Sequence, residues 1–339
     1  MKDVTDYSLL GHNTFGIDAH CRRFLEIETV GDALRLYSML SPADQPLLII
    51  GGGSNLLLTR DFPGTVIHSA IRGLEPAGDG SDGSVLLRAG SGETWDDVVQ
   101  TSIQHGWHGA ENLSLIPGDV GASAVQNIGA YGAEASHIIY NVEAVEISSG
   151  RQVTISAADC GYGYRQSRFK KEWRNRYFIT HVTYRLHTAF TPLLDYGNIR
   201  DVLRQRGITT PTASELRQAI VDIRREKLPD PLVEGNAGSF FMNPVVSRVK
   251  YEELAAQYPQ MPHYTIDAGH EKIPAGWMID QCGWKGRSLG RAGVHDRQAL
   301  VLVNRGGATG SEIVALCQAV QHDVRQRFGI DICPEVNII

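Results

Sequence analysis

Short apolar runs that stop at glycine fill the first half of the chain and predict strands. Residues 46–50 (Pro-Leu-Leu-Ile-Ile) form such a run, which ends at Gly51, and residues 84–89 form another. Hydrophobic and polar positions alternate at 140–148 and again at 176–186, which is typical of strands with one buried face. These segments predict that strands frame the middle of the chain.

Apolar residues at helical spacing predict four helices. Residues 29–38 form a capped amphipathic helix, and residues 95–105 form another that Gly106 ends. Farther on, 250–258 and 311–328 also have the spacing of amphipathic helices. The sequence therefore predicts helices on both sides of its middle strands.

The order of these elements indicates the fold class. Residues 290–305 are again strand-rich, and helices and strands are interspersed without a regular βαβ repeat. This favours an α+β fold over a doubly wound parallel sheet. With 339 residues the chain is long enough for two or three domains, and Pro229-Asp230-Pro231 is the best candidate boundary.

Composition and charge exclude several functions. Hydrophobic residues make up 42% and charged residues 21%, as in ordinary globular proteins, and the formal net charge is -6. An acidic chain without basic runs is not expected to bind nucleic acid or an anionic membrane. We find no signal peptide and no apolar run of the roughly 20 residues needed to cross a bilayer, so a cytoplasmic protein is expected.

The cysteines and histidines argue against a disulfide framework and a metal centre. The five cysteines are scattered and contain no Cys-x-x-Cys pair, which fits reduced thiols. The histidines show no His-x-x-x-His spacing. We therefore expect no metal site.

Two glycine-rich blocks are the first candidates for a binding site. Gly51-Gly52-Gly53-Ser54-Asn55-Leu56 follows a predicted strand, where consecutive backbone N–H groups can form a concave anion site. The block matches neither a P-loop nor the Gly-x-Gly-x-x-Gly of a dinucleotide-binding helix, and a tight hairpin is the alternative. The block 116–132 is long, rich in small residues and almost uncharged, and Gln126 and Asn127 add directional amides. Together the blocks favour a dinucleotide cradle over two unrelated turns.

The segment 235–244 (Gly-Asn-Ala-Gly-Ser-Phe-Phe-Met-Asn-Pro) places the Ser239 hydroxyl between small residues and aromatic rings. A nucleophilic serine needs a neighbouring base, and none lies nearby in the sequence. Ser239 is also outside the Gly-x-Ser-x-Gly elbow of hydrolases. The hydroxyl is therefore expected to donate a proton or to form a hydrogen bond.

The chain resembles the UDP-N-acetylenolpyruvoylglucosamine reductases, flavoenzymes of bacterial peptidoglycan synthesis. Six ordered blocks carry the resemblance and together span nearly the whole chain: Asn13-Thr14-Phe15-Gly16, 51–57, 116–132, Tyr162-Gly163-Tyr164-Arg165-Gln166-Ser167, 235–244 and Pro334-Glu335-Val336. Two positions depart from the family pattern. Met242 stands where lysine is common, and Asp119 stands where a small or neutral residue is common.

The resemblance implies three domains. Residues 1–73 with 330–339, and residues 74–228, would form an FAD-binding fold of the vanillyl-alcohol-oxidase (PCMH) type. Residues 229–329 would form an α/β substrate-binding domain. The segment 191–198 looks like the tyrosine loop of the longer, type I members of the family.

The resemblance also implies a reaction. Hydride from FAD, which NADPH has reduced, would reach the enolpyruvyl group of UDP-N-acetylglucosamine enolpyruvate and give UDP-N-acetylmuramate. Ser239 would supply the proton, while Arg165 and Glu335 would stabilise the developing charge. The sequence shows no separate NADPH fold, which favours a ping-pong cycle in which the two nucleotides bind in turn.

The same resemblance assigns the remaining contacts and the assembly. FAD would be bound without a covalent link, and the protein would act as a monomer. The expected FAD contacts are Gly51, Gly52, Gly53, Ser54, Asn55, Leu56, Ile116, Pro117, Gly118, Gly121, Ala122, Gln126, Asn127, Gly129, Tyr131 and Arg224. The expected substrate contacts are Tyr164, Tyr196, Lys227, Asn243 and Gln281.

Two other functions remain open at this point. One is a flavin oxidase or dehydrogenase of the same fold that acts on another substrate. The other is a nucleotide-sugar binding protein without catalytic activity. The oxidase or dehydrogenase would not need Arg165, Ser239 and Glu335 together.

Overall fold

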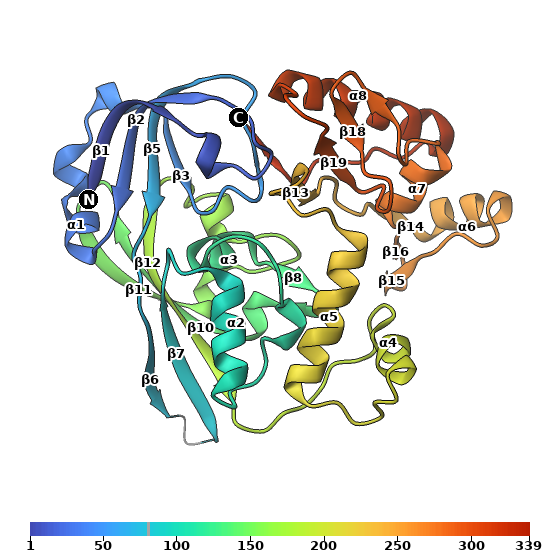
Figure 1. Ribbon diagram of the computed structural model, residues 1–339, viewed down its shortest axis with the longest axis horizontal. Coiled ribbons are helices and arrows are strands. Elements are labelled where there is room, and N and C mark those ends of the chain that lie inside the picture. Colours follow the sequence, from blue (N-terminus) through green and yellow to red (C-terminus); the bar gives the residue numbers. More distant parts are fainter. Residues whose placement is uncertain (80–81) are drawn as a thin grey trace. The chain divides into compact units, whose positions relative to one another are not determined.

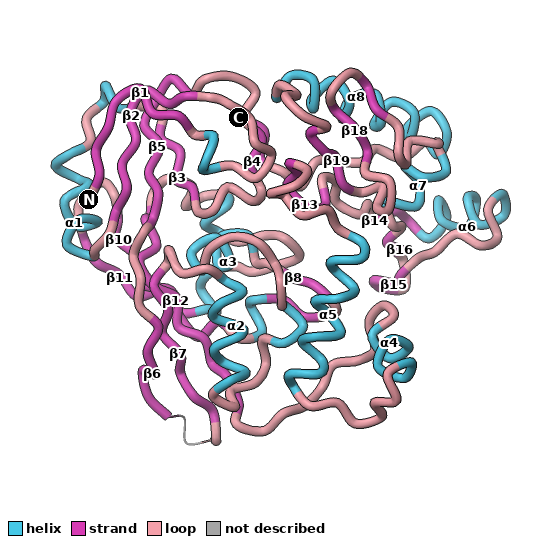
Figure 2. Tube along the Cα trace, viewed as in Figure 1, coloured by secondary structure: helices cyan, strands magenta, loops and turns pink. Residues whose placement is uncertain are grey.

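The computed structural model describes residues 1–79 and 82–339, and the chain forms two compact units (Figure 1). The first unit consists of Met1–Tyr7, Cys21–Gly52 and Pro63–Glu226, and the second of Ser8–His20, Gly53–Phe62 and Lys227–Ile339. Both units mix helices and strands, so the predicted α+β class is confirmed (Figure 2). Residues 330–339 lie in the second unit. The division into three domains stays a prediction.

The first unit begins with a four-stranded sheet in the order β1-β2-β5-β3. Its strands are β1 (Lys2–Ser8), β2 (His20–Ile27), β5 (Phe62–Ser69) and β3 (Leu47–Ile50). Strands β3 and β5 are parallel. Buried side chains of α1 (Val30–Met39), among them Ala33 and Leu36, share a core with Leu25 and Ile67 of this sheet.

The second sheet of this unit is antiparallel, in the order β11-β10-β12-β7-β6. Its strands are β6 (Leu74–Asp79), β7 (Ser84–Gly90), β10 (Ile139–Glu146), β11 (Arg151–Ser156) and β12 (Tyr177–His187). Two helices, α2 (Trp95–Gln104) and α3 (Val120–Gln126), contribute side chains to the same core. Trp95 and Tyr184 are almost completely buried there, and their ring centroids lie 5.3 Å apart.

The rest of the first unit is a pair of helices and a short ribbon. Helices α4 (Ile199–Gln205) and α5 (Ala213–Lys227) share a small apolar core in which Ile199, Leu216 and Ile220 are buried. Strands β8 (Gly129–Ala130) and β9 (Ala133–Glu134) form a two-stranded ribbon. Strand β8 lies inside the second glycine-rich block of the sequence, and β9 follows directly after it.

The second unit has three small sheets, in the orders β13-β19-β18-β17, β14-β16-β15 and β20-β4. Their strands are β4 (Leu56–Leu57), β13 (Gly235–Ser239), β14 (Val245–Ser247), β15 (Tyr264–Asp267), β16 (His270–Lys272), β17 (Ser288–Leu289), β18 (Ala292–Val294), β19 (Val301–Asn304) and β20 (Asn337–Ile338). Its helices are α6 (Arg248–Gln257), α7 (Ala275–Gln281) and α8 (Gly310–Phe328). The parallel pair β4–β20 joins the first glycine block to the C-terminal segment.

Each predicted helix and strand is confirmed within a few residues, and local capping sets the helix ends. Thr29 and Asp32 form a capping box at the start of α1, and Gly106, with φ 71°, follows the end of α2. Helix α6 begins two residues earlier than predicted, because the Ser247 hydroxyl accepts the Lys250 N–H at 3.2 Å. Among the residues that the structure describes, no helix is long and apolar enough to span a membrane.

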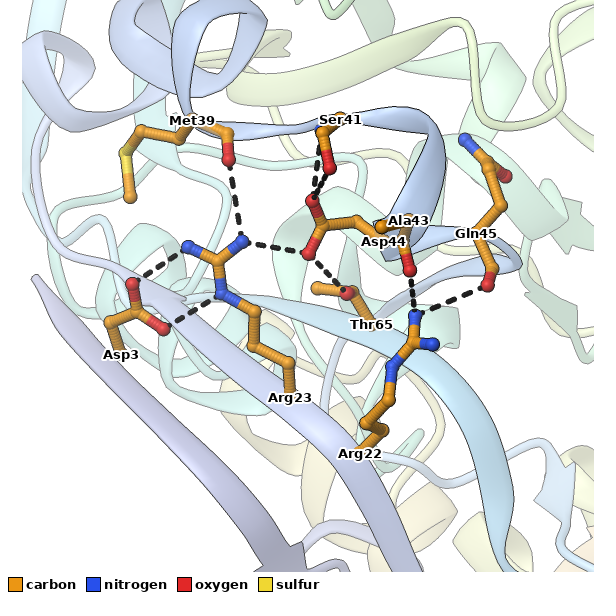
Figure 3. Close-up of polar contacts among 9 residues, drawn as sticks. All are labelled: Asp3, Arg22, Arg23, Met39, Ser41, Ala43, Asp44, Gln45 and Thr65. Carbon is orange, nitrogen blue, oxygen red and sulfur yellow. Dashed lines mark hydrogen bonds and ion pairs between the residues drawn. The ribbon is translucent and has the colours of Figure 1, made fainter.

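Arg23 on β2 ties the segment that precedes β3 to the first sheet (Figure 3). Its guanidinium pairs with Asp3 at 2.7 Å and with Asp44 at 2.8 Å. Asp44 also accepts hydrogen bonds from the Ser41 backbone N–H and hydroxyl, both at 2.8 Å. The side chains of Arg23 and Asp44 are 20% and 14% exposed, so solvent screens this ion pair only partly. The network fixes the turn from which β3 runs to the first glycine block.

We predict that Asp44→Asn destabilises the protein at pH 7 by about 2 kcal/mol. Burial alone would raise the pKa of Asp44, but hydrogen bonds from Arg23 and Ser41 outweigh it and lower the pKa from 3.8 to about 2. A lowered carboxyl pKa stabilises the fold above pH 3.8, and the contribution disappears as the pH falls through 2. Urea midpoints at pH 7 and pH 3 measure the difference, which should be smaller at pH 3.

The matched control for this prediction is Asp201→Asn on α4, where the carboxylate is 66% exposed. It should leave the urea midpoint nearly unchanged, because exposed ion pairs contribute little. Equal effects of the two substitutions would show that the Arg23 network does not stabilise the fold.

Candidate active site

The first glycine block follows β3 and crosses from one unit to the other after Gly52. It is not the tight hairpin considered as an alternative, because β3 pairs with β5 in parallel and Leu56 and Leu57 pair with β20. In the second unit, Gly53 has φ 65°, and a Cβ there would lie 2.0 Å from the carbonyl oxygen of His12. Glycine at position 53 is therefore required by packing alone. Ser54 and Asn55, which follow it, are half-buried.

In the first unit, Gly51 and Gly52 lie against Asp119. A Cβ at Gly51 would be 3.2 Å from Asp119 Oδ2, and a Cβ at Gly52 would be 3.2 Å from Asp119 Oδ1. Because Gly51 and Gly52 have no side chains, their backbone faces the second glycine block directly. They are the part of the first block that suits close approach of a ligand to the main chain.

The second glycine block is not a loop throughout, as the sequence suggested, because it contains the helix α3. Small residues let this helix pack closely on the sheet: the Gly121 N–H donates to the Ser91 carbonyl at 2.9 Å, and a Cβ at Gly121 would lie 3.0 Å from that of Ser91. The Ser123 hydroxyl is 2.7 Å from the Tyr184 hydroxyl. Of the expected FAD contacts, Ile116 and Gly118 before the helix and Gln126 at its end are half-buried, whereas Pro117 is exposed.

Asn127 ends α3 and holds three segments together. It is fully buried and left-handed, with φ 46°. Its Nδ2 donates to the Glu134 carboxylate at 2.8 Å and to the Gly163 carbonyl at 2.9 Å, while Oδ1 accepts the Ser136 N–H at 2.9 Å. The side chain of Asn127 is used for these contacts within the protein, and the expected contact of Asn127 with FAD stays a prediction.

Arg165 is fixed against the β8 ribbon. Its Nη2 donates to the Gly129 carbonyl at 2.6 Å, and its Cζ lies 5.3 Å from the centroid of the Tyr164 ring. The Lys170 ammonium donates to the Arg165 carbonyl at 3.3 Å. The backbone of Arg165 is left-handed, with φ 55°. A non-glycine residue in this conformation is strained, and such strain is concentrated at functional sites.

Arg224 on α5 lies near Tyr131 and Arg165. It donates to the Leu115 carbonyl at 3.2 Å and hydrogen-bonds with the Tyr131 hydroxyl. Burial lowers the pKa of Arg224, opposed by Tyr131 and Asp96, and burial raises the pKa of Tyr131. The structure therefore brings together Tyr131, Arg165 and Arg224, which the sequence placed in separate blocks.

Sequence reasoning missed the pair that supports this cluster. Arg217 on α5 grips Asp96 on α2 through two hydrogen bonds of 2.7 and 2.9 Å. Asp96 also accepts the Leu115 N–H at 2.5 Å. The pair fixes α5 and the left-handed Leu115, which in turn holds Arg224. A carboxylate at a helix start and a distant arginine carry no spacing signal that sequence could reveal.

The segment 191–198 brings Tyr196 near the same cluster. The Tyr131 and Tyr196 ring centroids are 6.5 Å apart with an edge-to-face geometry. The buried Asn112 donates to the carbonyls of Tyr131 at 2.8 Å and Leu193 at 3.0 Å, which joins the two segments. Tyr196 is 41% exposed, as a residue that receives a ligand can be.

In the second unit, Ser239 is exposed at the end of β13, opposite Val301. Gly238, with φ 67°, turns the chain just before it. The following rings of Phe240 and Phe241 are almost completely buried, and the Phe240 N–H donates to the Leu300 carbonyl at 2.8 Å. The aromatic residues thus anchor the strand and leave the serine hydroxyl accessible.

Glu335 joins this strand through its backbone. Its N–H donates to the Phe240 carbonyl at 2.8 Å, and the Met242 N–H donates to the Cys333 carbonyl at 2.9 Å. Asn55 Nδ2 donates to the Glu335 carbonyl at 3.3 Å. The structure therefore brings Glu335 to the residue next to Ser239, and Asn55 of the first glycine block to Glu335.

Other sequence motifs meet in the same unit. The Asn236 N–H donates to the Thr14 carbonyl at 2.9 Å, and the Thr14 hydroxyl donates to the Asn236 carbonyl at 2.6 Å. A Cβ at Gly235 would lie 2.2 Å from the Phe15 carbonyl oxygen. Through these contacts, the motif Asn13-Thr14-Phe15-Gly16 supports β13.

Two of the remaining expected substrate contacts, Asn243 and Gln281, lie by opposite ends of α7. Asn243 Oδ1 accepts the Ala275 N–H at 2.9 Å and so holds the first turn of α7. Gln281 is exposed at the other end of that helix, and its carbonyl accepts a hydrogen bond from Arg327. Lys227 is exposed where α5 ends, and Tyr164 is 42% exposed in the first unit.

The residues present fit an FAD molecule in all but one respect. The open backbone at Gly51 and Gly52 suits a diphosphate, and the partly buried Arg224 suits a flavin ring that becomes anionic. Asp119 does not suit a diphosphate, because it adds negative charge at the glycine block. Within the described part of the chain, no His, Cys, Asp and Glu side chains are grouped so as to hold a metal ion.

The fold and this site define a flavoprotein, since the profile of the FAD binding domain matches residues 22–156. The profile described as UDP-N-acetylenolpyruvoylglucosamine reductase, C-terminal domain, matches residues 230–339. The chain belongs to the UDP-N-acetylenolpyruvoylglucosamine reductase family, and it is an FAD-dependent oxidoreductase. The predicted family, FAD-binding fold and cofactor are thereby confirmed.

Relatives cover nearly the whole chain. The UDP-N-acetylenolpyruvoylglucosamine reductase of Bacteroides fragilis strain ATCC 25285 is 54% identical over 334 residues, which is 98% of this chain and 99% of that protein. The enzyme of Burkholderia multivorans is 48% identical over 98% of this chain and 95% of that protein. A crystal structure of the Thermus caldophilus reductase is similar in fold, with TM-score 0.68 and 22% identity over 99% of this chain and 98% of that chain.

We predict that Gly129→Ala destabilises the first unit and displaces Arg165. A Cβ there would lie 2.7 Å from Arg165 Nη1 and 2.9 Å from the Ala133 carbonyl oxygen. Overpacking of this kind costs about 1–3 kcal/mol. Urea unfolding measures the cost, and a crystal structure of the variant should show the guanidinium moved from Gly129.

Gly31→Ala in α1 is the matched control, because a Cβ there has only the Thr29 hydroxyl within reach, at 3.6 Å. It should be neutral or slightly stabilising. An unmoved Arg165 and an unchanged midpoint in Gly129→Ala would contradict the close packing described above.

Proposed function

We propose that this protein reduces UDP-N-acetylglucosamine enolpyruvate to UDP-N-acetylmuramate with NADPH, a step of peptidoglycan synthesis. Support comes from the family to which the chain belongs and from one geometric observation. The Glu335 N–H donates to the carbonyl of Phe240, so the backbone of Glu335 lies at the end of β13 that carries Ser239. A proton donor next to a charge-stabilising group is what reduction of an enolpyruvyl ether requires.

FAD supplies the hydride when it is bound. In the first unit, the backbone at Gly51, Gly52 and Gly118 would hold its diphosphate, and Arg224 would face the flavin ring with positive charge. The other expected contacts, Ile116, Pro117, Gly121, Ala122, Gln126, Gly129 and Tyr131, lie on the segments around α3 and β8. In the second unit, Gly53, Ser54, Asn55 and Leu56 would complete the set. We expect a noncovalent cofactor.

Arg165 is assigned to the carboxylate of the substrate. A guanidinium stays charged and offers several donors in a fixed plane. Its hydrogen bond to Gly129 and its position over the Tyr164 ring hold it in place before substrate arrives. A preorganised charge stabilises electron density that develops during the reaction without further reorganisation.

Ser239 is assigned the proton transfer, and Glu335 is assigned to assist it. The hydroxyl gives its proton to the substrate carbon that becomes basic when hydride adds to its neighbour. The buried rings of Phe240 and Phe241 keep the strand, and therefore the hydroxyl, in register. Glu335, held to Phe240 by its backbone, stabilises charge beside the reacting carbon.

Tyr164, Tyr196, Lys227, Asn243 and Gln281 are proposed to bind the nucleotide parts of the substrates. NADPH and the sugar nucleotide would bind in turn, in a ping-pong cycle. The monomeric state and the cytoplasmic location predicted from the sequence remain proposals too. All five cysteines are free thiols, as is usual in a reducing compartment.

Anaerobic mixing followed by flavin absorbance tests the function. NADPH should bleach the yellow colour, and UDP-N-acetylglucosamine enolpyruvate should restore it. A flavin oxidase or dehydrogenase would instead consume oxygen rapidly with a small alcohol or sugar and ignore the UDP-sugar. A binding protein without activity would be colourless, or yellow and not bleached by NADPH.

We predict that Ser239→Ala retains bleaching by NADPH, while reoxidation by the UDP-sugar slows by about 10²–10⁴. The serine acts only in the second half-reaction, where the substrate carbon takes up a proton. Stopped-flow absorbance measures both half-reactions, with Ser288→Ala, an exposed serine on β17, as the control. Equal slowing of both half-reactions by Ser239→Ala would rule out the proton-donor role.

A further inference from the structure

Asp119 is a half-buried acid that the proposed chemistry does not use. Its side chain is 15% exposed, and its two carboxylate oxygens lie 3.2 Å from the positions that a Cβ would take at Gly51 and Gly52. The Gly52 N–H donates a hydrogen bond to this carboxyl group. The carboxyl group of Asp119 therefore already accepts a hydrogen bond from the Gly52 N–H, which is one of the main-chain donors of the first glycine block.

The charged groups around Asp119 do not neutralise it fully. On β5, His68 Nε2 is 3.9 Å from Asp119 Oδ2, while His68 Nδ1 is 3.2 Å from Glu26 of β2. Arg72 attracts the carboxylate from the segment after β5, but it also pairs with Glu93 at 3.4 Å. The residues of α3 that follow Asp119 carry no charge.

These surroundings favour the neutral acid. Burial raises the pKa of Asp119 from 3.8 to about 6, although Arg72 and the Gly52 N–H act in the opposite direction. Burial likewise lowers the pKa of His68, with Glu26 opposing, so the histidine offers little positive charge at neutral pH. A carboxyl group in this position changes charge close to physiological pH.

The diphosphate of FAD would use the backbone N–H groups of the first glycine block, and one of these, the Gly52 N–H, donates to Asp119. An anion placed against Gly51 and Gly52 competes with an ionised carboxylate for the Gly52 N–H and is repelled by its charge. A protonated carboxyl group removes the repulsion and can itself donate a hydrogen bond to a phosphate oxygen. The bound diphosphate would in turn favour the protonated acid.

We propose that Asp119 takes up a proton when the diphosphate of FAD binds against Gly51 and Gly52, so that the protein holds its cofactor more tightly at lower pH. The inference rests on FAD as the cofactor and is independent of the substrate and of the roles of Ser239 and Glu335. It concerns retention of FAD and not the rate of the reaction.

Cofactor retention in the holoenzyme provides the test. Holoenzyme is diluted in a series at pH values from 6.0 to 8.0, and the fluorescence of released FAD gives the dissociation constant. For the wild-type chain, the constant should rise about tenfold or more across this range, because an acid with a pKa near 6 must be reprotonated for binding. In Asp119→Asn, the constant should be nearly independent of pH and lower than the wild-type value at pH 8.0.

Two substitutions serve as controls. Asp201→Asn, which removes an exposed carboxylate on α4, should keep the wild-type pH dependence. His68→Gln should also keep it, because the proposal assigns the proton to Asp119. A pH dependence that persists in Asp119→Asn and disappears in His68→Gln would overturn the proposal, as would uniform weakening by Asp119→Asn at every pH.

A proton count on the wild-type chain keeps the test decisive if a variant fails to fold. FAD is added to full-length apoprotein in a calorimeter at pH 7.5, in two buffers with different ionisation enthalpies. The difference in heat should correspond to uptake of nearly one proton per FAD. Uptake of no proton would overturn the proposal while leaving FAD binding and the reductase activity unaffected.

Discussion

The side chain of Asn127 holds the first unit's part of the candidate site together. One fully buried amide joins the end of α3, the β8–β9 ribbon and the Tyr162–Ser167 segment. Because buried amide groups are costly to leave unpaired, these segments can move only together. The guanidinium of Arg165 rests on the ribbon that Asn127 fixes, so its position follows from that amide.

The backbone strain of this region is balanced by a rigid core. Six described residues other than glycine have positive φ, and four of them, Leu115, Asn127, Tyr131 and Arg165, belong to this region. Each such conformation costs about 1–3 kcal/mol and persists only where the surroundings over-determine it. Here the buried side chains of α2 and α3 pack on the five-stranded sheet that contains β7, β10 and β12. The Asp96–Arg217 pair fixes α5. Stability in the core thus permits strain where ligands are expected.

The sequence predicted the elements well because periodicity and capping are local properties. Thr29 and Gly106 marked helix ends that the structure retains. The sequence could not predict that Glu335 pairs with Phe240, or that Asn127 bonds to Gly163, since such contacts depend on tertiary packing. The resemblance to a family supplied the roles of Arg165, Ser239 and Glu335, which residue patterns alone left open.

Glycine content alone is a poor guide to a binding site in this chain. Gly53 and Gly235 are required because carbonyl oxygens lie within 2.0 and 2.2 Å of where a Cβ would be, with or without a cofactor. Gly51 and Gly52 differ, because the atom nearest to a Cβ at either position would be a carboxylate oxygen of Asp119, at 3.2 Å. At these two glycines the chain can change the charge that a ligand meets. The electrostatics of Asp119 and Arg224, more than the glycine pattern, therefore distinguish a cofactor site from a tightly packed turn.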